Sequence, residues 1–77
     1  MVGDIIADAR VAAGMSVEDL AGRTKIRPSI ISAMEMDDFS ACGGDVYARG
    51  HLKSIASVLG IDPEVLLDEF DGGDGGR

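Results

Sequence analysis

Residues Ser16–Met36 read SVEDLAGRTKIRPSIISAMEM, a pattern that predicts two short helices joined by a tight connector. Ser16 is a good N-cap for a helix, because its hydroxyl can accept a hydrogen bond from a free backbone N–H of the first turn. Asp19, three residues later, is a short-armed counterpart of the acid in a capping box. This helix is expected to end near Thr24. A second helix is expected to begin at Pro28, since proline is tolerated at the first helical position.

Apolar residues give each of these helices one inward face. They recur at the i, i+3, i+4 spacing that is typical of an amphipathic helix. The residues concerned are Val17, Leu20 and Ala21 in the first helix and Ile30, Ile31 and Met34 in the second. Only residues 25–27 lie between the two helices, so they cannot fold back fully and should cross steeply. That is the geometry of a helix-turn-helix.

The pattern on either side predicts three more helices and hence an all-α fold. They span Gly3–Ala13, Asp45–Leu59 and Pro63–Phe70, the last with Asp62 as its N-cap. We expect one folded domain over residues 1–70. This length is near the lower limit at which a single hydrophobic core stabilises a domain without disulfides or a bound metal. Residues 71–77 (DGGDGGR) have the composition of a flexible acidic linker or tail.

Several single residues carry expectations of their own. Arg10 falls on an inward stripe and needs an acid, and we predict that it forms a structural pair with Glu35. Gly50 in the middle of a helix costs roughly 1 kcal/mol relative to alanine, and we expect close approach of another backbone to compensate for it.

Phe39 lies in the loop over residues 39–44, and its side chain is expected to fill the core from the loop side. Cys42 is expected to be a small filler or an exposed passenger.

The charge of the chain is unevenly distributed. The formal net charge is −7, and residues 62–77 hold six acids and one base. Residues 1–61 hold eight acids and six bases, so the helix-turn-helix body is close to neutral and is not basic. No apolar run approaches the roughly 20 residues of a membrane span, and we expect no signal peptide. We therefore expect a cytoplasmic location.

The sequence offers no recognisable catalytic or metal-binding set. Cys42 is the single cysteine, which excludes an intramolecular disulfide. It has no helper pair beside it, and His51 has no second ligand at a suitable spacing. The glycines do not open a strand–helix unit, so they form no phosphate loop. We predict that the domain is not an enzyme and holds no cofactor and no metal.

One candidate binding surface lies on the predicted fourth helix. Tyr47 and His51 are four residues apart and therefore neighbours on one face. Arg49 and Lys53 are also four apart, on an adjoining face. The functional interpretation is an aromatic patch with a basic border, suited to a protein partner. The alternative is that Tyr47 is half-buried and His51 merely exposed.

A second candidate surface would contact DNA. The densest basic cluster comprises Arg23, Lys25 and Arg27, beside a potential recognition helix with Ser29 and Ser32 on its exposed side. The alternative is a solvated turn, since charged residues favour surfaces. The exposed positions of that helix are small, and the usual readers of base edges are absent after the cluster. DNA is a possible partner, but the net charge disfavours it.

Two sets of motifs resemble known families. The positions Ile6, Arg10, Gly14-Met15-Ser16, Leu20-Ala21, Ile31 and Glu35 resemble the lambda-repressor-like, or XRE, helix-turn-helix superfamily. Three further stretches are similar to the N-terminal cytoplasmic domain of RodZ-type proteins: TKIRP (24–28), YARGHLKS (47–54) and LGIDP (59–63). The second resemblance covers residues 3–70.

The RodZ-type resemblance implies a five-helix, lambda-repressor-like domain at the front of a single-pass membrane protein. It implies a module that links the bacterial actin MreB to the machinery of cell elongation, at the cytoplasmic face of the inner membrane. Contact with the membrane would come only through a segment beyond this chain. The family places aromatic residues on the fourth helix at the positions of Tyr47 and His51, and His51 and Ile55 depart from the tyrosine or phenylalanine usual there. A substitute for MreB therefore stays open as the partner, and an XRE-like DNA-binding transcriptional regulator stays open as the alternative function.

Overall fold

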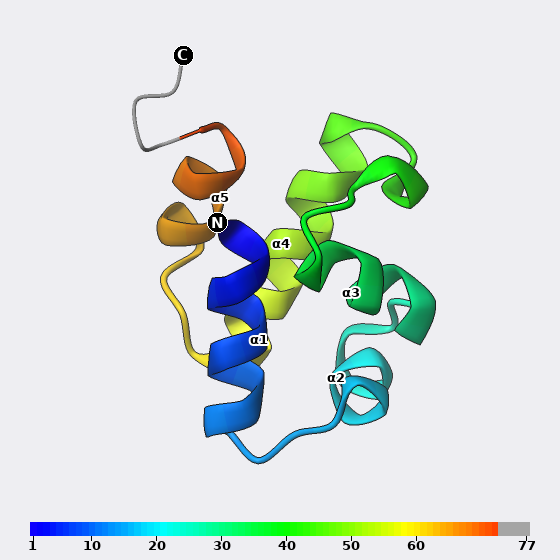
Figure 1. The fold of residues 1–77 in the computed structure, drawn as a ribbon, viewed down its shortest axis with the longest axis vertical. Helices are drawn as coiled ribbons and strands as arrows, with labels where there is room; N and C mark the ends of the chain where they lie inside the picture. The colour runs from blue at the N-terminus through cyan, green and yellow to red at the C-terminus, as the bar shows by residue number, and fades with distance from the viewer. Residues whose placement is uncertain (73–77) are drawn as a thin grey trace.

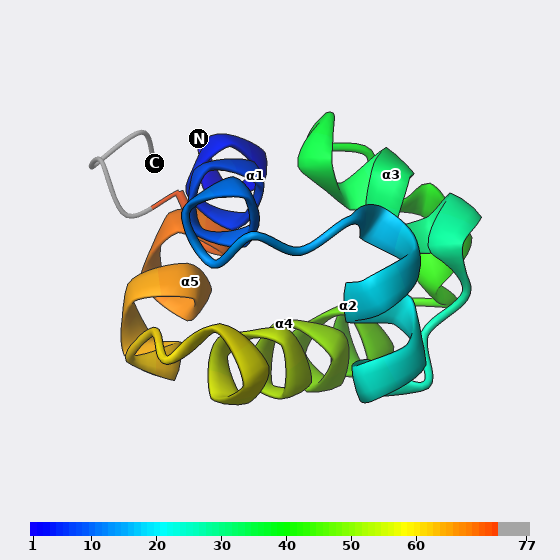
Figure 2. The same cartoon turned by 90° about the horizontal axis from the view of Figure 1, so that it is seen from below.

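The computed structural model describes residues 1–72, which form five α-helices and one short 3-10 turn (Figure 1). The elements are α1 (Val2–Ala12), α2 (Val17–Thr24), α3 (Pro28–Glu35), η1 (Ser40–Cys42), α4 (Asp45–Leu59) and α5 (Pro63–Phe70). The all-α, five-helix prediction is confirmed, with helix limits within one residue of the expected ones. Figure 2 shows α4 along one side, with α5 and α1 near its C-terminal end and α2 and α3 near its beginning.

The helix-turn-helix unit forms as its capping residues predict. The N–H of Asp19 donates to Ser16 Oγ at 2.9 Å, and the N–H of Ser16 donates to Asp19 Oδ2 at 3.0 Å. These two bonds complete a capping box at the start of α2. The helix closes at Lys25, whose φ of 63° is left-handed, and Pro28 then begins α3. The three-residue connector thus turns the chain sharply, as expected for this motif.

One core joins all five helices. Its largest fully buried side chains are Ile6, Leu20, Ile31, Met34, Leu52, Ile55 and Leu66. Phe39 packs against this core from the loop, with its ring edge-on to that of Phe70 at a centroid distance of 4.9 Å. Cys42 is buried, and this burial raises the pKa of its thiol. Phe39 therefore packs onto the core from the loop side, as expected, and the small side chain of Cys42 occupies a buried position in it.

Arg10 and Glu35 form the expected pair between α1 and α3. Arg10 Nε donates to Glu35 Oε2 at 2.7 Å, and Nη2 donates to Oε1 at 3.0 Å. The remaining arm, Nη1, donates to the Met15 carbonyl at 2.9 Å. The hydrogen bond with Glu35 raises the pKa of the Arg10 guanidinium above its ordinary value. This side chain therefore ties together α1, α3 and the connection that leads to α2.

The close backbone approach occurs at Gly3 and not at Gly50, so that prediction was wrong. Gly50 is exposed, and a Cβ added there would meet no atom within 4 Å. Successive helical residues are about 100° apart, so Gly50 points away from Ala48 and Leu52, which face the core. A Cβ on Gly3 would lie 2.4 Å from the carbonyl oxygen of Glu35. The glycine that the packing requires is therefore in α1.

The end of the described chain is a turn after α5. The N–H of Asp71 donates to the Leu67 carbonyl at 2.9 Å, and that of Gly72 donates to the Glu69 carbonyl at 3.1 Å. Residues 73–77 of the expected linker lie outside the described residues. Within residues 1–72, none of the helices combines the length and the apolar character needed to cross a bilayer.

Candidate functional site

Helix α4 places the two aromatic candidates on one flank. Its inward face buries Ala48, Leu52, Ile55 and Ala56 in the core. Tyr47 is 63% exposed, whereas His51, one turn later, is half-buried. This reverses the alternative in which Tyr47 is half-buried and His51 exposed. The phenol ring is therefore available to a partner, and the imidazole lies one helical turn away with part of its surface exposed.

Residues just before and beside Tyr47 keep its surroundings open. Gly43 and Gly44 have φ values of 93° and 124° and turn the chain from η1 into α4. A Cβ on Gly43 would lie 3.6 Å from Cδ2 of Tyr47, so the ring lies over this glycine. Val46 is 79% exposed and adds a second apolar side chain at the same end of α4. Clustered exposed apolar side chains often mark interaction sites.

Arg49 does not border this aromatic patch. Two residues along a helix are about 200° apart, so Arg49 lies on nearly the opposite flank from Tyr47. Its guanidinium forms an ion pair with Asp71, in which Nη1 donates to Oδ2 at 3.2 Å, and this hydrogen bonding raises the pKa of Arg49. The same group lies over the Phe70 ring, 5.5 Å from its centroid. Arg49 therefore fastens α4 to the end of α5.

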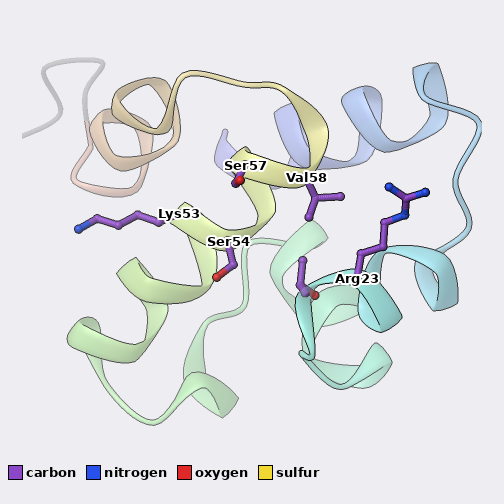
Figure 3. Close-up of a pocket in the computed structure, with 6 residues that line it drawn as sticks. Arg23, Lys53, Ser54, Ser57 and Val58 are labelled. Atoms are coloured by element: carbon purple, nitrogen blue, oxygen red, sulfur yellow. The ribbon is translucent and has the colours of Figure 1, made fainter.

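A groove between α2 and α4 was not expected from the sequence. It has a volume of about 390 Å³ and is lined by Arg23, Thr24, Lys53, Ser54, Ser57 and Val58. Figure 3 shows Lys53 and Arg23 on opposite sides of the groove, with Val58 and the two serines between them. Thr24 uses its hydroxyl to donate to the Leu20 carbonyl at 2.8 Å. The signal that could have revealed the groove is the row of small polar residues on the outer side of α4.

The candidate DNA contacts are exposed but fall into two groups. Lys25 and Arg27 flank the connector, as the C-cap of α2 and the N-cap of α3, and Ser29 and Ser32 are exposed on α3. Arg23 instead lines the α2–α4 groove. The structure thus brings four of the five residues to the turn and the exposed side of α3.

Two acidic residues, Asp37 and Asp38, lie just after the C-terminal end of α3. Asp37 Oδ1 accepts a hydrogen bond from the N–H of Gly3 at 2.9 Å. Asp38 accepts bonds from the hydroxyl and the N–H of Ser40, which lower the pKa of its carboxyl. These carboxylates hold the loop after α3 in place and put negative charge beside the candidate recognition helix. In residues 1–72, no group of three or more His, Cys, Asp or Glu side chains is arranged to hold a metal ion.

Comparisons with known proteins place this fold in a family. A family model described as a helix-turn-helix domain matches residues 5–66. The cytoskeleton protein RodZ of Streptococcus pneumoniae (strain ATCC BAA-255 / R6) is 33% identical over 72 residues, which are 94% of this chain and 26% of that protein. YmfM of Bacillus subtilis (strain 168), an uncharacterized membrane protein, is 33% identical over 55 residues, which are 71% of this chain and 19% of YmfM.

The chain spans about a quarter of the length of RodZ and about a fifth of that of YmfM. No solved structure matches it significantly. The family model covers most of the folded residues, including the whole helix-turn-helix unit, and the match to RodZ covers 94% of the chain. The chain therefore belongs to this helix-turn-helix domain family and is a distant homologue of the cytoskeleton protein RodZ.

Proposed function

We propose that this chain is the non-enzymatic protein-interaction domain of a RodZ-type protein. It couples an actin-like bacterial cytoskeleton, built from MreB or a substitute partner, to the machinery of the cell envelope. The domain works in the cytoplasm, at the inner face of the membrane when a longer protein carries a span. The observation that carries the proposal is the exposed Tyr47 on α4 of a chain homologous to RodZ.

The chemistry of the Tyr47 surface supports a protein partner. Tyrosine is enriched among the residues that dominate binding energy at protein interfaces. Tyr47 and Val46 present apolar area, and half-buried His51 offers a polar group beside it. The Tyr47 surface, which we define as Val46, Tyr47 and His51, therefore combines an aromatic anchor with a hydrogen-bonding neighbour.

A co-sedimentation experiment tests the proposal. Filaments of the MreB-type actin from the same organism are pelleted with increasing amounts of the domain. Replacing Tyr47 with alanine is expected to weaken binding at least tenfold, because truncating an interface hot spot costs about 2 kcal/mol or more. The melting temperature should stay unchanged, since the ring is largely exposed.

The matched control is Val11→Ala, which truncates an exposed apolar side chain on α1, outside the helix that carries Tyr47. It should bind the filaments like the wild type. Equal binding by Tyr47→Ala and the wild type would remove Tyr47 from the interface. Failure of the wild type to pellet with the filaments would exclude this actin as the partner.

The alternative is an XRE-like DNA-binding regulator, and the exposed pair Lys25 and Arg27 is the observation in its favour. The described residues include six arginines and lysines, and Arg10 and Arg49 are engaged in ion pairs. Strong DNA binders typically make about 6–10 phosphate contacts. Four remaining bases on an acidic domain fall short of that number.

Fluorescence anisotropy with a mixed-sequence labelled duplex at about 50 mM salt tests this alternative, since electrostatic binding is strongest at low salt. We expect no binding at tens of micromolar. Binding that declines steeply with salt and is lost in a Lys25→Glu/Arg27→Glu variant would favour the regulator instead.

A further inference from the structure

The charges of this domain are segregated between two regions. In the described part of the chain, the α2–α4 groove is lined by two cations, Arg23 and Lys53, and by no acid, and Asp19 lies one helical turn before Arg23 on α2. Residues 61–71, which include α5, contain five acids and no base. Figure 2 shows α5 and α2 at different ends of α4. Each molecule therefore carries a locally basic surface and a separate acidic one.

The groove supplies groups that suit a carboxylate-bearing ligand. Within residues 1–72, the side chains of Arg23 and Lys53 form no hydrogen bond or ion pair, and neither do the hydroxyls of Ser54 and Ser57. Half-buried Val58 adds an apolar contact between the two cations. The groove thus offers two positive charges, two hydroxyl donors and an apolar side chain.

The outer face of α5 carries the complementary groups. Leu66 is buried, which turns Glu64, Val65 and Asp68 outward. Glu64 and Asp68 are four residues apart and therefore neighbours on the helix surface. Val65 is 44% exposed and lies next to them in the sequence. The acidic ridge, defined as Glu64, Val65 and Asp68, matches the groove in both charge and apolar character.

We propose that the α2–α4 groove of one molecule binds the acidic ridge of a second copy. Arg23 and Lys53 pair with Glu64 and Asp68, and Val58 contacts Val65. Because the groove and the ridge are different surfaces, the contact is heterologous. When one groove and one ridge are engaged, each end of the pair keeps a free groove or a free ridge, and further copies add head-to-tail into a closed ring or an open chain, according to the rotation between neighbours. Exposed ion pairs are individually weak, so association requires a high local concentration.

Sedimentation velocity of the purified chain tests this contact. The weight-average mass is followed up to about 1 mM protein, the weak end of measurable affinities, at about 50 mM salt to limit screening. The wild type should grow in mass with concentration. Arg23→Glu/Lys53→Glu and Glu64→Lys/Asp68→Lys should each stay monomeric. An equimolar mixture of the two variants should associate again, because each basic surface then faces an acidic one.

Asp4→Lys/Asp8→Lys is the matched control. It changes the net charge by the same four units, at the same four-residue spacing, on exposed positions of α1. This variant should associate like the wild type. Circular dichroism checks that every variant is folded, and the single changes Lys53→Glu and Asp68→Lys replace any pair that is not.

Four results would overturn the proposal. They are a wild type that stays monomeric throughout, association that survives in either double variant, no recovery in the mixture, and loss of association in the α1 control. Binding of a DNA duplex to the groove without self-association would assign the groove to a different ligand. Loss of self-association leaves the actin experiment unaffected, because Tyr47 belongs to neither surface.

Discussion

Gly3 sets how closely α1 can approach α3. A Cβ at this position would lie 2.4 Å from the Glu35 carbonyl oxygen, which is backbone and cannot swing aside. The N–H of Gly3 also donates to Asp37, so any shift of α1 would strain that bond. The sequence did not reveal this role, because the crossing point of two helices depends on packing that a single-chain pattern does not contain.

Replacing Gly3 of α1 and Gly50 of α4 with alanine should change stability in opposite directions. Gly3→Ala should lower the free energy of unfolding by about 1–3 kcal/mol, the usual cost of overpacking. Gly50→Ala should raise it by roughly 0.5–1 kcal/mol, because alanine is the better helix former and the added methyl meets open space. Urea unfolding followed by circular dichroism measures both, and the same sign for both would refute this interpretation.

Arg10→Lys tests the fork-shaped contact with Glu35. Lysine keeps the charge but cannot reach both carboxylate oxygens and the Met15 carbonyl with fixed geometry. We expect a loss of about 1.5–3 kcal/mol in the free energy of unfolding, the range for hydrogen bonds to charged groups. Arg23→Lys, at an exposed position without an ion pair in residues 1–72, is the control and should stay within about 0.5 kcal/mol. Equal effects of the two changes would contradict a structural role for Arg10.

Helix α2 depends on its capping box, and this dependence has a pH signature. Hydrogen bonds from the N–H and then the hydroxyl of Ser16 lower the pKa of Asp19, with a smaller contribution from the charge of Arg23. The folded pKa therefore lies below the unfolded value of about 3.9. Stability from this group is fully present above the unfolded pKa and is lost as the pH falls through the folded pKa.

Ser16→Ala should destabilise the domain at neutral pH by about 1 kcal/mol, the typical value of an N-cap. Its free energy of unfolding should also fall less steeply than that of the wild type below about pH 4, because Asp19 then titrates closer to its ordinary value. Chemical unfolding at a series of pH values measures the difference. Parallel curves for the two proteins would show that the capping box does not contribute to the acid response.

At the scale of elements, periodicity predicted the helices and the core face of α4, because both follow from the 3.6-residue repeat and from local caps. The arrangement of its flanks could not be predicted, since it depends on where the neighbouring helices lie. Arg49 was expected beside Tyr47 but pairs with Asp71, because α5 returns along that flank. The α2–α4 groove was missed for the same reason, since it forms only when Arg23 and Lys53 come together from separate helices.

At the scale of the whole molecule, the candidate surfaces are separated. The Tyr47 surface lies at the beginning of α4, the exposed bases Lys25 and Arg27 at the connector, and the acidic ridge on α5 (Figure 1). A change at one surface should therefore leave binding at another within about 0.5 kcal/mol, as expected for distant sites without shared partners. Glu64→Lys/Asp68→Lys should accordingly bind actin filaments as the wild type does, measured in the same pelleting experiment.

The most direct test of a protein-binding role for α4 is residue-by-residue mapping of the bound surface by NMR. Amide signals of the isotope-labelled domain are followed while unlabelled MreB-type actin from the same organism is added. We predict that the signals of residues 43–54 shift or broaden first, centred on Tyr47 and His51, and that those of residues 25–32 stay in place. Changes centred on Lys25, Arg27 and the exposed serines of α3, with α4 unaffected, would contradict the proposed function.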